Sequence, residues 1–345
     1  MAFIDFARAL RETRGVKRHL LLGNGFSIAL KPDIFSYASL YDNADFSVAP
    51  HVPELFEALE TKDFEIVIRH LQDTARVVEV YRPKLTKLTA KLNADASAIK
   101  DALVSAIAGR HPDRPYDITA DQYRACRQFL SHFNHLFTLN YDVLLYWALM
   151  QDEVDELDLP HDDGFRHPED DPEQPWVSWQ QANSASVNYL HGALHLFDNT
   201  TEIIKYTWSK TDVPIVEQIR QSLAEDRFPI FVAEGATSTK KQRILHNAYL
   251  HKAMRSLEGC CKPTGNAIFI YGHSLHANDD HVLRGITCGG ARSLYVSLYG
   301  DPDSEGNKAI SERASKLVDD RREQRGDKFP LSVRFFEAAS AAVWG

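Results

Sequence analysis

The segment Thr138-Leu139-Asn140-Tyr141-Asp142 places two polar side chains at the end of an apolar stretch. The carboxamide of Asn140 can both donate and accept hydrogen bonds, so it can hold a sugar hydroxyl or an attacking water in a fixed position. Asp142 precedes an apolar run at 143–150 and is explained equally well as the cap of a helix. Capping does not account for Asn140, which makes this segment a candidate catalytic element.

His191 is a second candidate, in Tyr189-Leu190-His191-Gly192 at the end of another apolar stretch. The ordinary pKa of a histidine side chain, about 6.5, suits proton transfer near neutral pH. The chain has 15 histidines, however, and most of them must be structural. On an extended strand His195 would lie about 13 Å from His191, so we do not expect the two to share a metal ion.

A glycine-containing loop, Gly23-Asn24-Gly25-Phe26-Ser27, directly follows the first apolar stretch. Glycines there let backbone amides approach a phosphate, and the start of a helix would add a partial positive charge. The alternative is a simple turn, because the third glycine of the dinucleotide-binding fingerprint is absent.

The fourth candidate is Gly272-His273-Ser274-Leu275, again at the end of an apolar stretch. Gly272 and Ser274 suit contacts with phosphate or ribose, and Asp279 could bind ribose hydroxyls or cap the next helix. His273, His276, Asp280 and His281 could also be drawn as metal ligands, but their spacing matches no known metal motif.

Alternating strands and helices must position these groups. We expect strands at 19–25, 135–142, 187–192, 202–208, 229–235, 266–272, 293–300 and 332–338, and helices at 121–133, 143–150, 214–226, 239–258, 279–287 and 306–322. This alternation predicts an α/β, Rossmann-like fold: a mostly parallel sheet with helices on both faces and ligands at the carboxyl ends of the strands.

Residues 40–127 interrupt this alternation, because their apolar residues recur every three, four or seven positions. That period is typical of amphipathic helices. We therefore predict an all-helical insertion at 40–127 within a Rossmann-like core formed by 1–39 and 128–345.

The acidic character of the chain is concentrated in one segment. Residues 151–173 hold eleven acidic residues and one arginine, a local charge of −10, whereas the whole chain carries −9. We expect a solvated loop that is not a core element. The rest of the chain is nearly neutral, so its charge does not argue against an anionic ligand. The loop lies between Asn140 and His191, which makes it a candidate lid or partner contact.

Composition narrows the class of protein. Hydrophobic residues make up 44% and charged residues 25%, as in a soluble globular protein with a sizeable core. The four cysteines form no C-x-x-C pair, and we see neither an export signal nor an apolar run long enough to span a bilayer. We expect a cytoplasmic protein that binds no membrane, and nothing indicates nucleic acid.

The order of the four elements, G-N-G-F-S, L-N-Y-D, L-H-G and G-H-S-L, resembles the sirtuin-like NAD-binding superfamily. T-L-N-Y-D with Y-L-H-G is similar to the stand-alone bacterial branch that hydrolyses NAD in antiphage defence. The resemblance spans about 23–280, interrupted by the helical insertion. It implies an NAD glycohydrolase that releases nicotinamide and ADP-ribose or its cyclised form. It also implies an oligomer, with a sensor or ATPase as a possible partner protein.

The same resemblance assigns roles to the individual residues. Asn140 would orient the ribose or the water, His191 would act as a base at the ribose hydroxyls, and Asp142 matches the acidic position of the family. The cofactor-binding residues implied are Gly23, Asn24, Gly25, Phe26, Ser27, Gly272, Ser274 and Asp279. NAD would be the substrate, and cleavage of its glycosidic bond requires no metal.

The sequence departs from the sirtuin pattern at some positions, and alternative functions stay open. Asn24 replaces the small residue usual between the glycines, and the chain lacks the zinc-binding cysteine pairs of sirtuin deacylases, so protein deacylation is disfavoured. We interpret Lys240 and Lys241 as solvated lysines in the first turn of a helix. The alternative functions are a non-catalytic sensor of NAD or ADP-ribose, and a metal-dependent hydrolase built on the histidines at 273–281.

Overall fold

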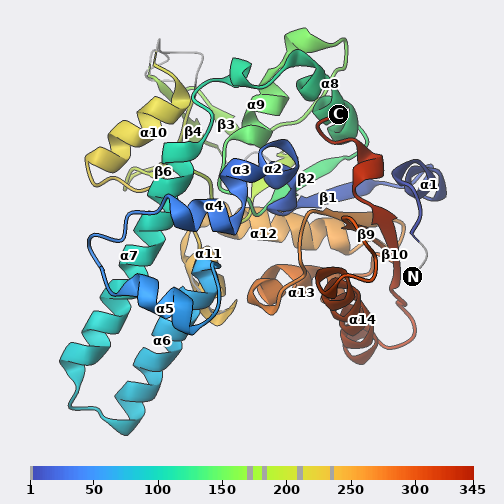
Figure 1. Ribbon diagram of the computed structural model, residues 1–345. Helices are drawn as coiled ribbons and strands as arrows, with labels where there is room; N and C mark the ends of the chain where they lie inside the picture. The colour runs from blue at the N-terminus through green and yellow to red at the C-terminus, as the bar shows by residue number, and fades with distance from the viewer. Residues whose placement is uncertain (1–2, 169–173, 181–184, 208–212, 234–236) are drawn as a thin grey trace.

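Six parallel strands form the main sheet of the computed structural model, which describes residues 3–168, 174–180, 185–207, 213–233 and 237–345 (Figure 1). In order across the sheet they are β10 (Ser332–Glu337), β9 (Ser293–Leu298), β8 (Ala267–Tyr271), β1 (Arg18–Leu22), β2 (His135–Thr138) and β5 (Val187–Tyr189). All five pairings between them are parallel. The α/β, Rossmann-like fold predicted from the sequence is therefore confirmed.

The central strands read as continuous apolar runs because both faces of the sheet are covered. Every residue of β8 is buried, as are the last four residues of β1. Strands that are buried on both faces show this pattern in place of alternation. β2, the next strand along the chain, pairs with one edge of β1, and the later strand β8 pairs with the opposite edge of β1. Such a reversal leaves a crevice at the carboxyl ends of the strands.

Helices flank this sheet on both faces (Figure 1). On one face lie α1 (Phe6–Glu12), α8 (Ala120–Leu130) and α9 (Leu144–Met150), with α2 (Gly25–Leu30) and α3 (Pro32–Phe35) near the carboxyl ends of the strands. On the other face lie α12 (Ala248–Cys261), α13 (Asp280–Cys288) and α14 (Glu305–Arg325). The ring of Phe6 on α1 lies 5.3 Å from that of Phe129 on α8 and 6.2 Å from that of Phe269 on β8, which joins both helices to the sheet.

Between α3 and α8 the described elements are all helical. They are α4 (Tyr37–Asp42), α5 (Val52–Ala58), α6 (Phe64–Tyr81), α7 (Thr86–Arg110) and the short η1 (Pro115–Asp117). The helices α6 and α7 pack together as a hairpin that projects from the body of the molecule (Figure 1). The all-helical insertion is thus present. Its predicted boundaries fall inside α4 and α8, and the division into domains at those residues stays a prediction.

A second, antiparallel sheet was missed by the sequence reasoning. It is formed by β3 (Phe165–Arg166), β4 (Trp176–Trp179), β7 (Ile203–Tyr206) and β6 (Leu196–Asp198), in that order. Since β3 lies in the acidic segment and Phe165 is buried there, the prediction that this segment contributes nothing to the core is wrong. Residues 169–173 lie outside the described part of the chain.

The acidic segment is held by ion pairs as well as by this strand. Asp155, after η2 (Asp152–Val154), pairs at 2.9 Å with Arg127, whose side chain is only 1% exposed. Asp163 pairs with Lys205 on β7. These carboxylates neutralise buried cations, so the local charge of the segment overstates how much of it faces solvent.

Two further expectations fail in the second half of the chain. The strand predicted at 229–235 is, in its described residues 229–233, a single antiparallel bridge between Phe231 and Gly192. Residues 234 and 235 lie outside the described ranges. The helix predicted at 239–258 is two helices, α11 (Thr237–His246) and α12. The chain breaks at Asn247, whose side chain caps α12 by accepting a hydrogen bond from the amide of Leu250.

The remaining elements are α10 (Ile215–Ala224), η3 (Ala277–Asp279) and η4 (Ala339–Ala341). Of the helices in the described ranges, none combines the length and apolarity that crossing a membrane requires.

Candidate functional site

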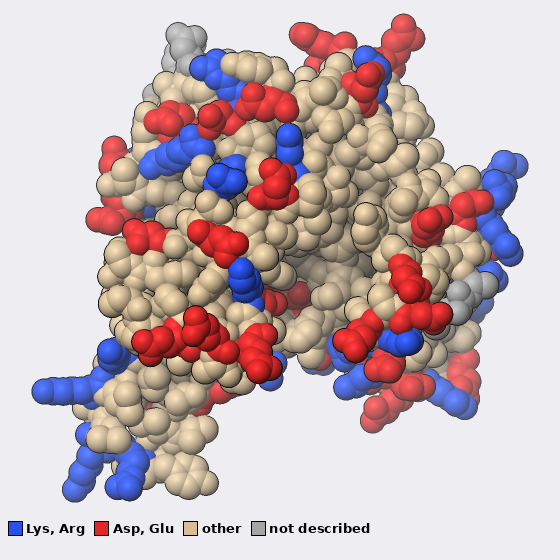
Figure 2. Space-filling model, in the orientation of Figure 1, with Lys and Arg blue, Asp and Glu red and all other residues tan. Residues whose placement is uncertain are grey.

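A cavity of about 790 Å³ opens at the carboxyl ends of β1, β2 and β8. Its walls come from both parts of the fold: the loops after these strands, and residues of the insertion such as Asp63, Glu65 and Leu103. Figure 2 shows a hollow near the middle of one face of the molecule. The volume is in the range of small-molecule and cofactor sites.

The structure brings most of the predicted site residues to this cavity. Those that line it are Gly23, Asn24, Gly25, Asn140, Asp142, His191, Gly272, Ser274 and Asp279. Two do not. The ring of Phe26 is buried 5.0 Å from the ring of Trp344, and Ser27 is fully buried beneath the cavity wall. The backbone of Phe26 also accepts a 2.8 Å hydrogen bond from the indole of Trp344. These two side chains support the loop from behind.

The glycine loop packs directly against the loop after β8. A Cβ atom added to Gly25 would lie 2.5 Å from the Cα of Gly272, and Gly272 itself has a φ of +68°. The amide of Gly25 donates to the carbonyl of Gly272 at 2.8 Å, and the amide of Gly23 donates to that of Tyr271 at 2.9 Å. Both glycines are therefore needed for a close backbone crossing. A role in binding pyrophosphate stays a prediction, because these two amides already have acceptors.

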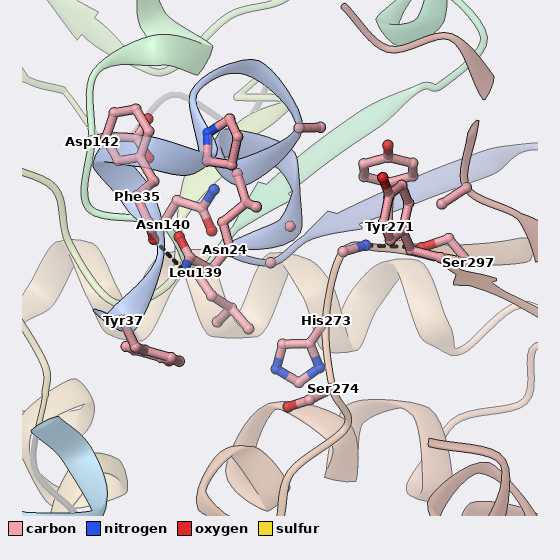
Figure 3. A pocket seen from close by; sticks show the side chains of 18 of the residues that line it. Asn24, Phe35, Tyr37, Leu139, Asn140, Asp142, Tyr271, His273, Ser274 and Ser297 are labelled. Carbon is pink, nitrogen blue, oxygen red and sulfur yellow. Dashed lines mark hydrogen bonds between the residues drawn. The ribbon is translucent and has the colours of Figure 1, made fainter. Parts of the chain in front are cut away.

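Asn24 has a structural role of its own. Its side-chain Nδ2 donates to the carbonyl of Phe35 at 3.0 Å, as drawn in Figure 3. This bond ties the glycine loop to α3, which explains why an amide can stand where a small residue was expected.

Asn140, Ser27 and Asp142 form a buried hydrogen-bond chain. The hydroxyl of Ser27 donates to Oδ2 of Asp142 at 2.5 Å and accepts from Nδ2 of Asn140 at 2.8 Å. Oδ1 of Asp142 accepts from the amide of Leu144, the first residue of α9, at 2.9 Å. The N-cap position itself is Val143, so Asp142 satisfies a helix amide, as its structural alternative predicted, from one residue before the cap. Burial raises the pKa of Asp142, and the bonds from Ser27 and Leu144 oppose that shift.

The hydrogen-bond chain leaves the side-chain oxygen of Asn140 without a partner in the described part of the protein. Because Nδ2 of Asn140 is committed to Ser27, Oδ1 is the atom left over, and it is buried with no hydrogen-bond partner among the described residues. Asn140 is 7% exposed and lines the cavity. A buried acceptor without a partner is costly for the fold, and a donor that reached this oxygen would offset that cost.

His191 lies in a cluster of imidazoles and charges at the side of the cavity. Its Nε2 is 2.9 Å from Nε2 of His281 and 3.8 Å from Oδ1 of Asp279. Burial, and after it the positive charge of Lys240, holds the pKa of His191 well below its usual range. Burial likewise lowers the pKa of His281 to about 4. Both rings are therefore neutral at pH 7, and one of the two Nε2 atoms donates its proton to the other.

The position of His191 depends on Gly192. This glycine has a φ of +82°, and a Cβ atom there would lie 1.9 Å from the carbonyl oxygen of Ile230. Only glycine lets the chain at 230–232 pass so closely, where the amide of Val232 donates to the carbonyl of His191 at 3.0 Å. The histidine-glycine dipeptide thus has a steric basis.

Lys240 was interpreted as a solvated lysine, and that interpretation is wrong. Its side chain is fully buried, and its ammonium lies 2.7 Å from Oε2 of Glu65 and 3.0 Å from Oδ1 of Asp279. Burial alone would lower the pKa of Lys240, but the two carboxylates raise it overall. For Asp279 burial acts to raise the pKa, and Lys240 and His273 outweigh it, so the carboxyl remains ionised. The interpretation of Lys241 as exposed is confirmed.

Glu65 was also missed by the sequence reasoning. It comes from α6 in the insertion, and besides Lys240 its carboxylate accepts a 3.3 Å hydrogen bond from the hydroxyl of Tyr141. Burial raises the pKa of Glu65, and Lys240 opposes that shift. An acidic residue inside the apolar run Phe64–Ile68 was the available signal, because such residues are seldom buried without a partner.

The metal ligands drawn from the sequence do not come together. His276 and Asp280 are exposed, and Asp280 pairs with Arg313. At the side of the cavity the described donors that group together are instead His191, Asp279 and His281. The ammonium of Lys240 already lies against Asp279 at 3.0 Å, where a metal ion would be repelled.

The sequence matches one protein family, Domain of unknown function (DUF4917), over residues 20–344. This chain belongs to the DUF4917 family. No curated protein matches the sequence of this DUF4917 chain.

The solved structures that match this chain include three Sir2 homologues. A mutant bound to 2'-O-acetyl ADP ribose is 12% identical, with a TM-score of 0.36, over 93% of the DUF4917 chain and 98% of its own. An NAD complex is also 12% identical, with a TM-score of 0.35, over 91% and 94%. A mutant bound to ADP ribose is 14% identical, with a TM-score of 0.34, over 91% and 96%. Scores this low do not transfer the role of any residue.

Proposed function

We propose that this protein is an NAD+ glycohydrolase, which cleaves the bond between nicotinamide and ribose and releases nicotinamide and ADP-ribose or its cyclised form. The observation that carries the proposal is the carboxamide of Asn140. It is buried, its orientation is set by Ser27 and Asp142, and its oxygen is left without a partner at the wall of a cavity that His191 also lines. The order of the sequence motifs supports the same activity.

Hydrolysis to ADP-ribose consumes one water and releases one proton. The bond between the ribose carbon and the ring nitrogen breaks, and both electrons leave with nicotinamide. Water then attacks the cationic ribose and loses its proton. In this proposal the free oxygen of Asn140 accepts a hydrogen bond from the water or from a ribose hydroxyl and so holds it in line for attack. His191, neutral at pH 7, is the acceptor for a proton at a ribose hydroxyl.

The charges around the cavity favour a cationic intermediate. Four acidic side chains line the cavity, namely Asp63, Glu65, Asp142 and Asp279. The cation buried beside them is Lys240, which pairs with two of the four. Negative charge beside a site where positive charge develops lowers the barrier of a reaction without any metal. Asp279 is the carboxyl whose pKa Lys240 and His273 hold low against burial, whereas burial raises the pKa of Asp63, Glu65 and Asp142.

The test is to incubate the purified protein with NAD and to separate the products by chromatography. Asn140→Ala should lower kcat at least about 100-fold, because it removes the positioned acceptor. His191→Ala should lower it at least as much if the imidazole moves a proton. Asn199→Ala and His251→Ala are matched controls at exposed positions, and they should retain full activity.

A non-catalytic sensor of NAD or ADP-ribose is the outcome that would replace this proposal. It would appear as a ligand-dependent rise in melting temperature with no nicotinamide released by wild-type protein at any oligomeric state. Activity equal to wild type in both cavity variants would remove the catalytic assignment of Asn140 and His191.

We further propose that the enzyme is a cytoplasmic antiphage effector that depletes NAD, works as an oligomer and is kept inactive by a sensor or ATPase partner until it is triggered. The resemblance of its motifs to defence NAD hydrolases supports this role. NAD levels measured during phage infection, in cells that carry wild type or Asn140→Ala, test it.

A further inference from the structure

A second cluster of chemically reactive side chains lies at the opposite end of the sheet from the cavity. His19 is the second residue of β1 and His135 the first of β2, and the two are direct partners in the parallel register. Their side chains therefore leave the same face of the sheet. The ring centroids are 5.0 Å apart.

Cys260, near the end of α12, completes the cluster. One donor atom from each of His19, His135 and Cys260 lies within 4.8 Å of the other two. These residues belong to three elements that are distant in the sequence, and α12 covers this face of the sheet (Figure 1). Imidazole nitrogen and cysteine thiolate are both ligands that zinc takes in proteins.

The histidines have spare coordinating capacity. Nδ1 of His19 and Nδ1 of His135 are both buried, and neither has a hydrogen-bond partner in the part of the chain that the structure describes. His19 is 2% exposed and Cys260 8%, whereas His135 is only half-buried. An ion could therefore enter past His135, and a water on that side could complete four ligands.

Asn266 is the neighbouring polar group. Its Nδ2 lies 3.0 Å from Nε2 of His19 and donates at 2.9 Å to the carbonyl of Cys260, which links two members of the cluster. A ring that binds metal through Nδ1 carries its proton on Nε2. Asn266 would then turn its amide to accept that proton with oxygen and would give up its bond to Cys260. Such partners orient the ligating histidine in metal sites.

We propose that His19, His135 and Cys260 bind one zinc-like divalent cation that fastens α12 to the amino ends of β1 and β2. This site is separate from the NAD cavity, and its role is structural. It does not depend on the proposed glycohydrolase activity, because β1 carries its histidine at one end and the glycine loop at the other.

The test measures metal content and ligand type. The protein is produced without a metal-binding tag in zinc-supplemented medium and assayed by elemental analysis, where about one zinc per chain is expected. The metal-free protein is then titrated with cobalt(II), and a thiolate-to-cobalt charge-transfer band should develop with one equivalent.

Cys260→Ser should abolish the band and weaken cobalt binding at least about 100-fold. Loss of a residue that only orients a metal ligand lowers metal affinity by up to about 100-fold, so loss of a ligand itself should cost at least as much. Cys288→Ser, at a partly exposed thiol outside the cluster, is the matched control and should keep the band. If Cys260→Ser does not fold, His135→Asn at the half-buried position replaces it, and bound zinc should protect Cys260 of the wild type from alkylation. Absence of zinc together with absence of the band in wild type would overturn the proposal, and so would a band that survives Cys260→Ser.

Discussion

Replacing Lys240 by methionine would remove the cation that two buried carboxylates share. The ammonium lies 2.7 Å from Glu65 and 3.0 Å from Asp279, and its side chain is fully buried. Methionine fills a similar volume without charge. Removing one partner of a buried ion pair typically costs about 3–5 kcal/mol, because the remaining charge is left uncompensated.

That free energy converts into a measurable shift in melting temperature. At about 2.1 cal/mol/K per residue, the unfolding entropy of 345 residues is about 0.7 kcal/mol/K. The expected decrease for Lys240→Met is therefore about 4–7 °C at pH 7. Differential scanning calorimetry measures it directly.

Lys241→Met is the matched control, because the neighbouring lysine is exposed. An exposed substitution of this kind should change stability by no more than about 0.5 kcal/mol. Equal melting temperatures for the two variants would refute the burial of Lys240 and restore the interpretation of both lysines as solvated.

The pH dependence of the same variant supplies a second check. Without Lys240, the pKa of Glu65 and of Asp279 should both lie above the unfolded value, so the folded state would hold protons that the unfolded state has lost. Such a group stabilises the fold at low pH and loses that contribution as the pH rises through its folded pKa. The deficit of Lys240→Met relative to wild type should therefore be smaller at pH 5 than at pH 8, and a deficit that does not change with pH would contradict this account.

Three further predictions concern the site and the core. Gly192→Ala should destabilise the fold by more than about 1 kcal/mol in urea unfolding, because φ at this residue is +82° and the new Cβ would meet the carbonyl of Ile230. Gly109→Ala is the control: it lies in α7 with open space around the added Cβ, and it should stabilise the fold by about 0.5–1 kcal/mol. Ser27→Ala should lower kcat for NAD at least about tenfold with little change in KM, because Asn140 loses its orienting partner, and an unchanged kcat would show that this hydrogen-bond chain is only structural. The free energy of unfolding should rise between pH 4 and 6.5 and level off above pH 6.5. Burial lowers the pKa of His19, His111 and His281 to about 4, so the unfolded chain binds more protons than the folded chain in that interval, and each histidine contributes up to about 3 kcal/mol. A flat profile over this range would contradict the burial of these three histidines as neutral rings.

The parallel sheet was predictable because its strands are short apolar runs that end on glycine or polar residues. β1 and β8 are examples, with Gly23 and Gly272 directly after them. The small antiparallel sheet was not predictable in the same way, because β3 and β6 are two and three residues long. Strands that short leave no periodic pattern, and they form only where neighbouring strands supply hydrogen bonds.

The polar wall of the cavity was predicted in part. Asn140, Asp142 and His191 stand at the ends of strands, where the sheet itself brings them to one edge. Glu65 and Lys240 come from helices, and helical position alone does not tell which charged side chain turns inward. Their pairing spans 175 residues of sequence, and only tertiary packing determines it.

The strand order also decides when the site can exist during synthesis. β1 is made early, yet one of its two neighbours in the sheet, β8, begins only at Ala267, and the carbonyl that the amide of Gly25 needs belongs to Gly272. Contacts between residues so far apart form late, after a large loop has closed. A nascent chain that has exposed Asn140 and His191 but not yet β8 lacks one wall of the cavity. The cavity, and any activity that depends on it, is therefore incomplete until most of the chain has emerged from the ribosome.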